Sequence, residues 1–184
     1  GSRGLGDVYK RQDEDLKEVA KKVMRGKTMN AGQICLAPDY LMLPKGKSKD
    51  FYDASKEAIE GMFENLKYNE DYTSVINEKH YDRINELITD AKEKGAEVLE
   101  INPANEDFEQ QELHKIPPTL VMNPTEDMKI MQEEIFGPVL PVKEYENFSE
   151  TINYVNSKDR PLGLYLFSKD STKEKEVLNN TTSG

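Results

Sequence analysis

The sequence predicts an α/β fold in which helices flank a mostly parallel sheet. Short apolar runs of strand length alternate with segments whose apolar residues recur at helical spacing. Strands that are separated by helices in this way are typical of parallel sheets. No linker or internal repeat divides the 184 residues, so we expect one domain. Ligands in such sheets gather at the carboxyl ends of the strands.

The first half of the chain alternates helix, strand and helix. An apolar stripe over residues 16–24 predicts a helix that Asp13 or Asp15 can cap and Gly26 can end. The apolar run 39–44, closed by a proline, predicts a buried strand. By the same criteria we expect helices at about 48–66 and 78–94 and a strand at 96–101.

The second half continues the alternation after a polar, irregular stretch at 102–115 that predicts a loop. The remaining expected elements are strands at 117–122, 139–145 and 162–168, a helix that Asn147 or Ser149 can cap and that runs through Val155, and a helix at about 171–178.

The first twelve residues, GSRGLGDVYKRQ, do not share this pattern. Gly-Ser is a common protease scar, and the basic, glycine-rich segment after it has no apolar periodicity. We expect residues 1–12 to derive from cloning or from a gene-assembly error and to be disordered, and the folded domain to occupy residues 13–184.

Charge and cysteine content exclude several classes of function. The chain has 25 Lys and Arg residues and 35 Asp and Glu residues, a net charge of −10, whereas nucleic-acid binding needs clustered basic residues. No apolar run reaches membrane-spanning length and no signal peptide is visible. One cysteine excludes an internal disulfide and favours a reducing compartment. We therefore expect a cytoplasmic protein without a nucleic-acid or membrane partner.

The segment MNAGQICLAPD holds the only cysteine, Cys35. A free cysteine is more often a small buried hydrophobe than a reactive group. Here Ala31 and Gly32 let backbone amides approach a ligand closely, and Asn30 and Gln33 favour a loop. Such a loop can activate a thiol and hold an oxyanion. These residues alone leave both interpretations open, a buried thiol and a nucleophile.

A second candidate is the segment QEEIFGPVLP, which precedes an expected strand. Two carboxylates, Glu133 and Glu134, come before Phe136, and a Gly-Pro pair forces a turn. A carboxylate can accept two hydrogen bonds from a ribose diol, and an aromatic edge can support a flat ring. Local features alone favour the simpler alternative, a solvated acidic turn with Phe136 in the core.

The two histidines, His80 and His114, lie far apart in unrelated contexts. No spacing of Cys, His, Asp and Glu is typical of a metal site, so we expect no metal. Because His80 begins an expected helix, a surface or capping role is favoured over catalysis. Residues 13–184 contain neither a dinucleotide-binding glycine motif nor a P-loop.

Together the two candidate segments are more specific than either one alone. NAGQICLAPDY and QEEIFGPVLPV resemble the two signatures of the aldehyde dehydrogenase superfamily at about the family's spacing, and RPLGLYLFSKD and NNTTSG resemble the strand and loop downstream. The resemblance covers nearly all of residues 13–184. APDYLMLP, DYTSVIN and HKIPPTLV are most similar to the bacterial coniferyl-aldehyde dehydrogenase branch.

This resemblance implies a role for each candidate residue. Cys35 would be the nucleophile whose thiolate attacks an aldehyde to give a thiohemiacetal, and its backbone N–H would be one oxyanion donor. Hydride would pass to NAD or NADP, and water would hydrolyse the resulting thioester to the acid. Glu134 would hold the nicotinamide ribose, with Phe136 packed beside it.

The resemblance also implies that parts of the family's enzyme are missing. The dinucleotide-binding domain, the second oxyanion amide, the general-base glutamate and a C-terminal oligomerisation segment have no counterpart in this sequence. We therefore expect a truncated catalytic domain that binds no cofactor alone and lacks full oxidoreductase activity. Its cysteine loop should lie on an exposed face and produce an apolar patch or self-association. Homo-oligomers are expected for full-length family members and stay open for this chain.

Two other functions remain open at this point. One is a thiol esterase or acyl-transfer enzyme on the same fold, and the other is a non-catalytic association module with an unreactive Cys35. The sequence defines neither the aldehyde nor the choice between NAD and NADP.

Overall fold

A computed structural model describes residues 5–9 and 15–183, which form one six-stranded sheet in the order β3-β4-β5-β2-β1-β6. All neighbouring strands are parallel except β3 and β4, which are antiparallel. The strands are β1 (Leu5–Tyr9), β2 (Pro38–Pro44), β3 (Glu97–Glu100), β4 (Thr119–Met122), β5 (Val139–Tyr145) and β6 (Leu164–Phe167).

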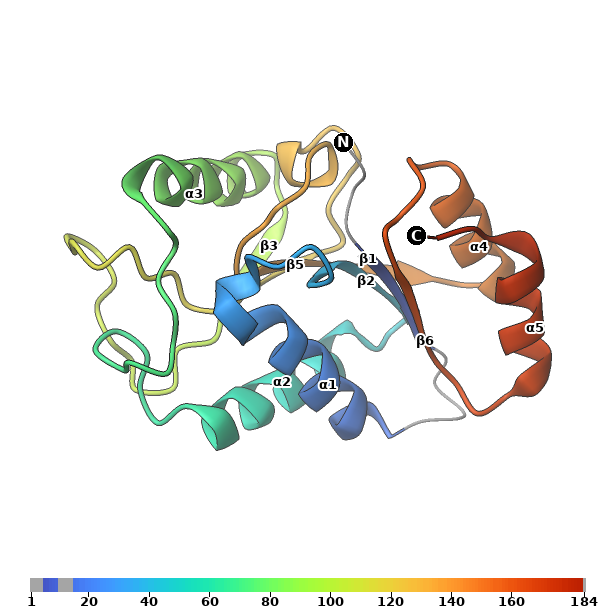
Figure 1. Ribbon diagram of the computed structural model, residues 1–184, viewed down its shortest axis with the longest axis horizontal. Helices are drawn as coiled ribbons and strands as arrows, with labels where there is room; N and C mark the ends of the chain where they lie inside the picture. Colours follow the sequence, from blue (N-terminus) through green and yellow to red (C-terminus); the bar gives the residue numbers. More distant parts are fainter. Residues whose placement is uncertain (1–4, 10–14, 184) are drawn as a thin grey trace.

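Helices cover both faces of this sheet. In Figure 1, α1 and α2 lie side by side below the sheet, α3 lies above it, and α4 and α5 lie near the β6 end. The predicted architecture, a mostly parallel sheet flanked by helices, is confirmed. The helices are α1 (Leu16–Thr28), α2 (Ser48–Met62), α3 (Glu78–Glu93), α4 (Phe148–Asn156) and α5 (Ser171–Asn180), with short 3₁₀ turns η1 (Met29–Gly32) and η2 (Lys129–Met131).

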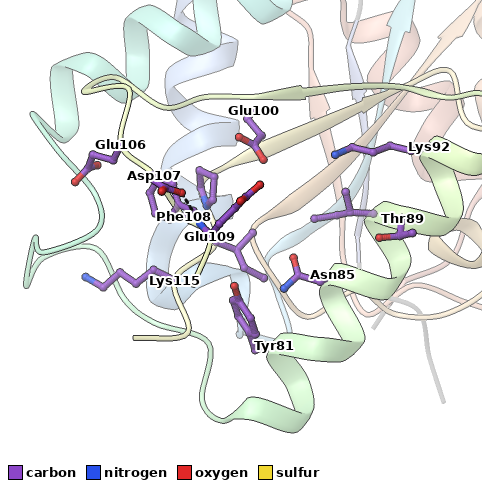
Figure 2. Close-up of a pocket in the computed structure, with 13 residues that line it drawn as sticks. Tyr81, Asn85, Thr89, Lys92, Glu100, Glu106, Asp107, Phe108, Glu109 and Lys115 are labelled. Carbon is purple, nitrogen blue, oxygen red and sulfur yellow. Dashed lines mark hydrogen bonds between the residues drawn. The ribbon is translucent and has the colours of Figure 1, made fainter. Parts of the chain in front are cut away.

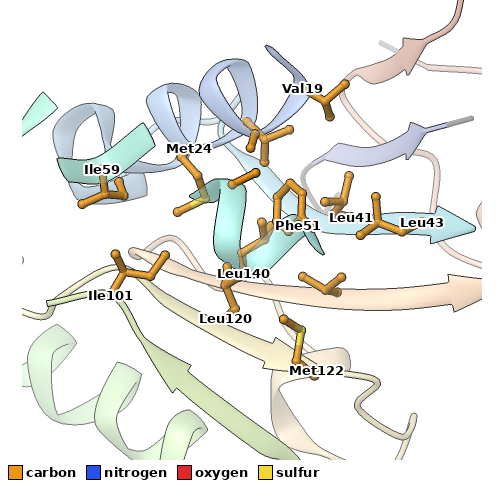
Figure 3. Packing of buried hydrophobic residues seen from close by; sticks show 14 residues of the cluster. Val19, Met24, Leu41, Leu43, Phe51, Ile59, Ile101, Leu120, Met122 and Leu140 are labelled. Carbon is orange, nitrogen blue, oxygen red and sulfur yellow. The ribbon is translucent and has the colours of Figure 1, made fainter. Parts of the chain in front are cut away.

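The central strand β2 is buried on both faces. Leu41 and Leu43 belong to the main hydrophobic cluster, which lies between the sheet and helices α1 and α2 (Figure 3). Tyr40 and Met42 point to the other face and pack with Tyr145 at the end of β5. Burial of successive residues on opposite faces explains why this segment reads as an uninterrupted apolar run.

The first helix begins where the sequence predicts and ends later. The Asp15 side chain accepts a hydrogen bond from the Lys17 N–H at 3.0 Å, so Asp15 is the cap. The predicted stop at Gly26 is wrong, because α1 continues to Thr28. A Cβ atom at Gly26 would lie 3.3 Å from Cδ of Pro38, so this glycine serves close packing of the helix against β2.

The structure differs from the expectation of disorder at Leu5–Tyr9. The backbone of this segment forms β1 between β2 and β6 and pairs in parallel with both. A strand in this position gives hydrogen-bonding partners to the facing backbones of both neighbours, and composition alone does not reveal that opportunity. Residues 1–4 and 10–12 lie outside the described residues, and the origin of the first twelve residues stays a prediction.

Candidate active site

The two candidate segments meet at one edge of the sheet. The cysteine loop leads into β2 and the acidic turn leads into β5, and these strands are parallel neighbours. Their amino ends therefore lie at the same edge. We expected ligands at the carboxyl ends of the strands, which is the rule for open α/β sheets. Both predicted segments lie at the opposite edge, because each precedes its strand.

Two glycines allow the backbones of these segments to touch. A Cβ atom at Gly32 would lie 2.3 Å from the carbonyl oxygen of Gly137, closer than any real contact. A Cβ atom at Gly137 would in turn lie 2.5 Å from Cδ1 of Ile84 on α3. Gly32 is thus required by the close approach of the Gly137 backbone, which joins the cysteine loop to the acidic turn, whereas Gly137 packs against the flexible Ile84 side chain.

The cysteine loop has an unusual backbone. Asn30, Ala31 and Gly32 adopt φ values of 50°, 54° and 71° in succession, which is the left-handed region. For a residue such as Ala31 this conformation costs about 1–3 kcal/mol. Phe136 in the acidic turn also has a φ of 50°. Strained residues of this kind cluster at functional sites when the surrounding structure holds them in place.

Gln33 holds the loop by both ends of its side-chain amide. Its Nε2 donates to the Asn30 carbonyl at 3.0 Å and to the Ser74 carbonyl at 3.1 Å. Its Oε1 accepts a hydrogen bond from the Ile76 N–H at 2.9 Å. Gln33 therefore fixes the cysteine loop against the segment that precedes α3, a role that its local sequence did not reveal.

The structure places Cys35 at the surface. The thiol is free and exposed, which excludes the alternative of a buried core thiol. Within the described part of the chain, the backbone N–H of Cys35 makes no hydrogen bond. An accessible sulfur next to an available N–H can attack a carbonyl carbon and stabilise the oxyanion that forms.

The two adjacent glutamates have different environments. Glu133 pairs with Nη1 of Arg83 at 3.1 Å. The carboxylate of Glu134 makes no hydrogen bond or ion pair with any described residue. Partial burial, with a smaller contribution from the Asp39 carboxylate, raises the pKa of Glu134, whereas Arg83 and Lys27 oppose this rise. Glu134 is therefore the carboxylate that can accept hydrogen bonds from a ligand.

Phe136 lies beside this carboxylate and is 38% exposed, so the alternative of a core phenylalanine is wrong. It lines a hollow of about 300 Å³ together with Asn30, Gln33 and Ile76. Other exposed apolar side chains belong to the same region. They are Met29, Leu36 and Ile76; Ile76 lines the same hollow as Phe136, whereas Leu36 lines a second one with Tyr165 and Phe167.

Sequence reasoning missed two residues that hold the acidic turn. Arg83, on α3, donates to the carbonyl oxygens of Glu134 and Ile135. Asp39, on β2, accepts a hydrogen bond from the Ile135 N–H at 3.1 Å through Oδ1. A carboxylate inside an apolar strand was a usable signal for Asp39. A charge on the outer side of an amphipathic helix gave no such signal for Arg83.

Other candidates lie outside this edge of the sheet. His80 is exposed, and its backbone N–H bonds to the Asn77 side chain that caps α3, as its predicted surface position requires. His114 packs against the ring of Tyr81. The described residues contain no group of three or more potential metal ligands. A hollow of about 430 Å³ between α3 and the loop that follows β3 contains no residue of either candidate segment (Figure 2).

The structure thus places an exposed thiol in the loop before β2, and an available carboxylate and an exposed aromatic ring in the turn before the neighbouring strand β5. Residues 9–184 match the profile of the aldehyde dehydrogenase family. The chain therefore belongs to this family, as the resemblance predicted. In the described residues, no helix is long and apolar enough to cross a membrane.

Named relatives agree with this assignment. The chain is 51% identical over 181 residues to a probable coniferyl aldehyde dehydrogenase of Caulobacter vibrioides, covering 98% of the chain and 37% of the relative. It is 44% identical to a coniferyl aldehyde dehydrogenase of Pseudomonas sp., with 98% and 38% covered. The chain thus spans little more than a third of the length of these relatives.

Solved structures show the same fold. The substrate-bound state of Staphylococcus aureus AldH superimposes with a TM-score of 0.86 at 30% identity and covers 99% of this chain and 38% of that one. An NADP-dependent glyceraldehyde-3-phosphate dehydrogenase from Bacillus halodurans, in complex with NADP, gives 0.82 at 28% identity, with 100% and 37% covered.

Proposed function

We propose that this chain supplies the cysteine-bearing half of the active site of an NAD(P)-dependent aldehyde dehydrogenase. The observation that carries the proposal is the contact of Gly32 with Gly137, which brings the loop of the exposed Cys35 to the turn of the available Glu134. The proposed substrate class is an aldehyde, with coniferyl or another aromatic aldehyde supported by the names of the relatives.

Cys35 is the nucleophile in this proposal. The thiol first releases its proton to solvent; the thiolate sulfur then forms a bond with the aldehyde carbon, and the carbonyl oxygen becomes the oxyanion of a thiohemiacetal that the Cys35 N–H can stabilise. Loss of hydride from that carbon leaves a thioester on Cys35. Water then breaks the carbon–sulfur bond and releases the carboxylic acid, which frees the thiol for another cycle. Exposure of Cys35 supports this role.

Glu134 and Phe136 fit a nicotinamide cofactor. A carboxylate without an internal partner among the described residues can accept both hydroxyls of a ribose, and the exposed edge of Phe136 can pack against the sugar and the flat ring. When bound, NAD(P) supplies the acceptor for hydride. The neighbouring Glu133 forms an ion pair with Arg83, so Glu134 is the one of the two glutamates that is available to bind the ribose.

The 184-residue chain alone is proposed to have no useful oxidoreductase turnover and to hold no cofactor. It spans 37% of its Caulobacter relative, and removal of a single oxyanion donor lowers turnover by roughly two to three orders of magnitude in well-studied enzymes. The apolar side chains around Cys35 support contact with another protein surface. We propose that the longer protein is a cytoplasmic homo-oligomer.

A chimera tests this function. Residues 13–184 replace the matching segment of the Caulobacter relative, and formation of reduced nicotinamide is followed with coniferyl aldehyde and with an aliphatic aldehyde, using NAD and NADP. We expect turnover that Cys35→Ala removes, and a higher KM for the cofactor in Glu134→Gln. Glu133→Gln is the matched control for the second variant.

Three results would contradict the proposal. A folded chimera without turnover would show that Cys35 is not the nucleophile of an aldehyde dehydrogenase in this chain. Burst hydrolysis of an activated ester without formation of reduced nicotinamide would favour an esterase or acyl-transfer enzyme instead. Robust NAD-dependent turnover by the 184-residue chain alone would contradict the proposed need for a longer protein.

A further inference from the structure

Asp39 connects the two halves of the proposed site. It is the second residue of β2, four positions after Cys35, and it is only 3% exposed. Its Oδ1 accepts a hydrogen bond from the Ile135 N–H at 3.1 Å. Ile135 lies between Glu134 and Phe136, so one carboxylate links the strand that follows the thiol to the turn that carries both proposed cofactor contacts.

The position of Asp39 is costly for a charge. The next four residues of β2 are buried and apolar or aromatic, and a buried carboxylate is unfavourable unless cations and hydrogen-bond donors compensate it. Lys27 is 1% exposed and donates to the carbonyl of Pro38 at 2.7 Å, next to Asp39. Arg83 approaches the same turn from α3. Asp39 and Arg83 therefore bond to the backbone N–H and carbonyl of Ile135, and Lys27 bonds to the residue before Asp39.

Stability alone does not explain this arrangement. A parallel strand needs no side-chain acceptor for its own pairing, and an apolar residue at the second position would avoid the burial of a carboxylate. A carboxylate does have one specific effect, because it fixes the orientation of the Ile135 amide. That amide is adjacent to Phe136, whose φ of 50° is held only by its surroundings.

We propose that Asp39 is a positioning residue that holds the Glu134–Phe136 turn in register with the Cys35 loop. The inference rests on the proposed function, because it concerns the geometry of that same site. Asp39 acts through the Ile135 amide and touches neither substrate nor cofactor. Loss of this hydrogen bond releases the turn while the thiol remains in place.

The chain contains no tryptophan, so a Phe136→Trp variant reports on the turn alone. We compare the Phe136→Trp protein itself with its Asp39→Asn and Asp39→Leu derivatives by acrylamide quenching and fluorescence anisotropy of the new tryptophan. Asp39→Leu is expected to raise the quenching constant about two-fold, because the turn opens locally. Asp39→Asn keeps an oxygen acceptor and is expected to stay close to the parent. Ser55→Ala, a fully buried position on α2, is the control for a general change in the core.

Circular dichroism establishes that each variant is folded. A folded Asp39→Leu protein with unchanged quenching would overturn the proposal, and so would an Asp39→Asn protein that opens as far as the leucine variant.

Hydrogen exchange in the unsubstituted chain gives a measurement that needs no variant. The Ile135 amide should exchange more slowly than the amides of Glu134 and Phe136, which make no hydrogen bond among the described residues. Equal rates would also overturn it.

The chimera separates this inference from the proposed function. There Asp39→Leu is expected to raise the KM for NAD(P) about ten-fold with a smaller change in kcat, because the turn is misplaced and the thiol is not. Asp39→Asn should recover most of the loss. If the chimera has no turnover but the tryptophan reporter responds, the function is wrong and the structural role stands. If the chimera is active but KM does not change, Asp39 has no positioning role.

Discussion

Two irregular regions of this molecule contain left-handed residues, and they are stabilised in different ways. The loop that follows β3 has positive φ at Asn105, Gln110 and His114, and asparagine and histidine are enriched in this region among residues other than glycine. The site segments place Ala31 and Phe136 there, which have no such tendency. Asn105 and His114 in the loop therefore suit their conformation locally, whereas Ala31 and Phe136 in the site depend on neighbours.

Two glutamines make the same comparison. The Gln111 side chain forms three hydrogen bonds with backbone groups, all to residues within four positions. The Gln33 side chain also forms three, but two of them reach Ser74 and Ile76, more than forty residues away. The Gln111 hydrogen bonds are therefore local, and the long-range hydrogen bonds of this loop come from Glu106, His114 and Lys115 instead. The side chain that holds the cysteine loop depends instead on the distant segment before α3.

The largest effect is expected from Gly32→Ala. A methyl group there would overlap the Gly137 carbonyl at 2.3 Å and would hold an alanine at a φ of 71°, so we expect a loss of about 3 kcal/mol in the free energy of unfolding. Gly46→Ala is the matched control. Gly46 has a φ of 82° with no atom within 4 Å of the added methyl, so only the backbone cost of about 1–2 kcal/mol applies. Urea denaturation measures both, and equal losses would show that the two segments do not touch.

The pair Gln33→Ala and Gln111→Ala gives the next effect. Each removes three hydrogen bonds, and we expect each to lower the free energy of unfolding by about 1–2 kcal/mol. The positions of the changes should differ. Hydrogen exchange should increase at residues 74–76 in Gln33→Ala, and the alkylation rate of Cys35 should change with it. In Gln111→Ala the changes should stay within the loop. An unchanged cysteine loop in Gln33→Ala would contradict the comparison.

The smallest effect concerns Glu134. Burial and the Asp39 carboxylate raise its pKa, so the native state binds this proton at a higher pH than the unfolded chain does. The ionised group therefore lowers stability at neutral pH, and stability recovers as the pH falls through the raised pKa. Glu134→Gln should be more stable at neutral pH by about 0.5 kcal/mol after solvent screening, with no advantage near pH 4.

Glu133→Gln should change stability in the opposite direction. It loses the ion pair with Arg83, so its free energy of unfolding at neutral pH should fall slightly, by about 0–1 kcal/mol. Urea denaturation at several pH values measures both variants. The same sign for the two variants at neutral pH would contradict the different environments assigned to these adjacent carboxylates.

The sequence predicted the parts of the fold that depend on local pattern. Helical spacing located α1 to α5, and the apolar run around Leu41 located β2, because burial on one stripe or on both faces leaves a periodic signal. It did not predict β1, whose strand conformation depends on pairing with β2 and β6. It also placed the end of α1 at Gly26, where the close approach of Pro38 decides the outcome.

The site shows the same limit. Resemblance singled out Cys35, Glu134 and Phe136, and the structure brings their two segments together. Asp39 and Arg83 were missed, because their partners in the acidic turn lie 96 and 52 positions away. Contacts of that separation are determined by the strand order β5-β2 and by the packing of α3, and neither follows from a local pattern.

The central claim is that the folded chain presents Cys35 in an open loop at the amino edge of the sheet. Because the chain has one cysteine, alkylation followed by intact mass measures this thiol alone. We expect complete labelling of the native chain, at a rate within about ten-fold of that of the urea-unfolded chain, as an exposed thiol requires. Labelling that occurs only after unfolding would contradict the claim.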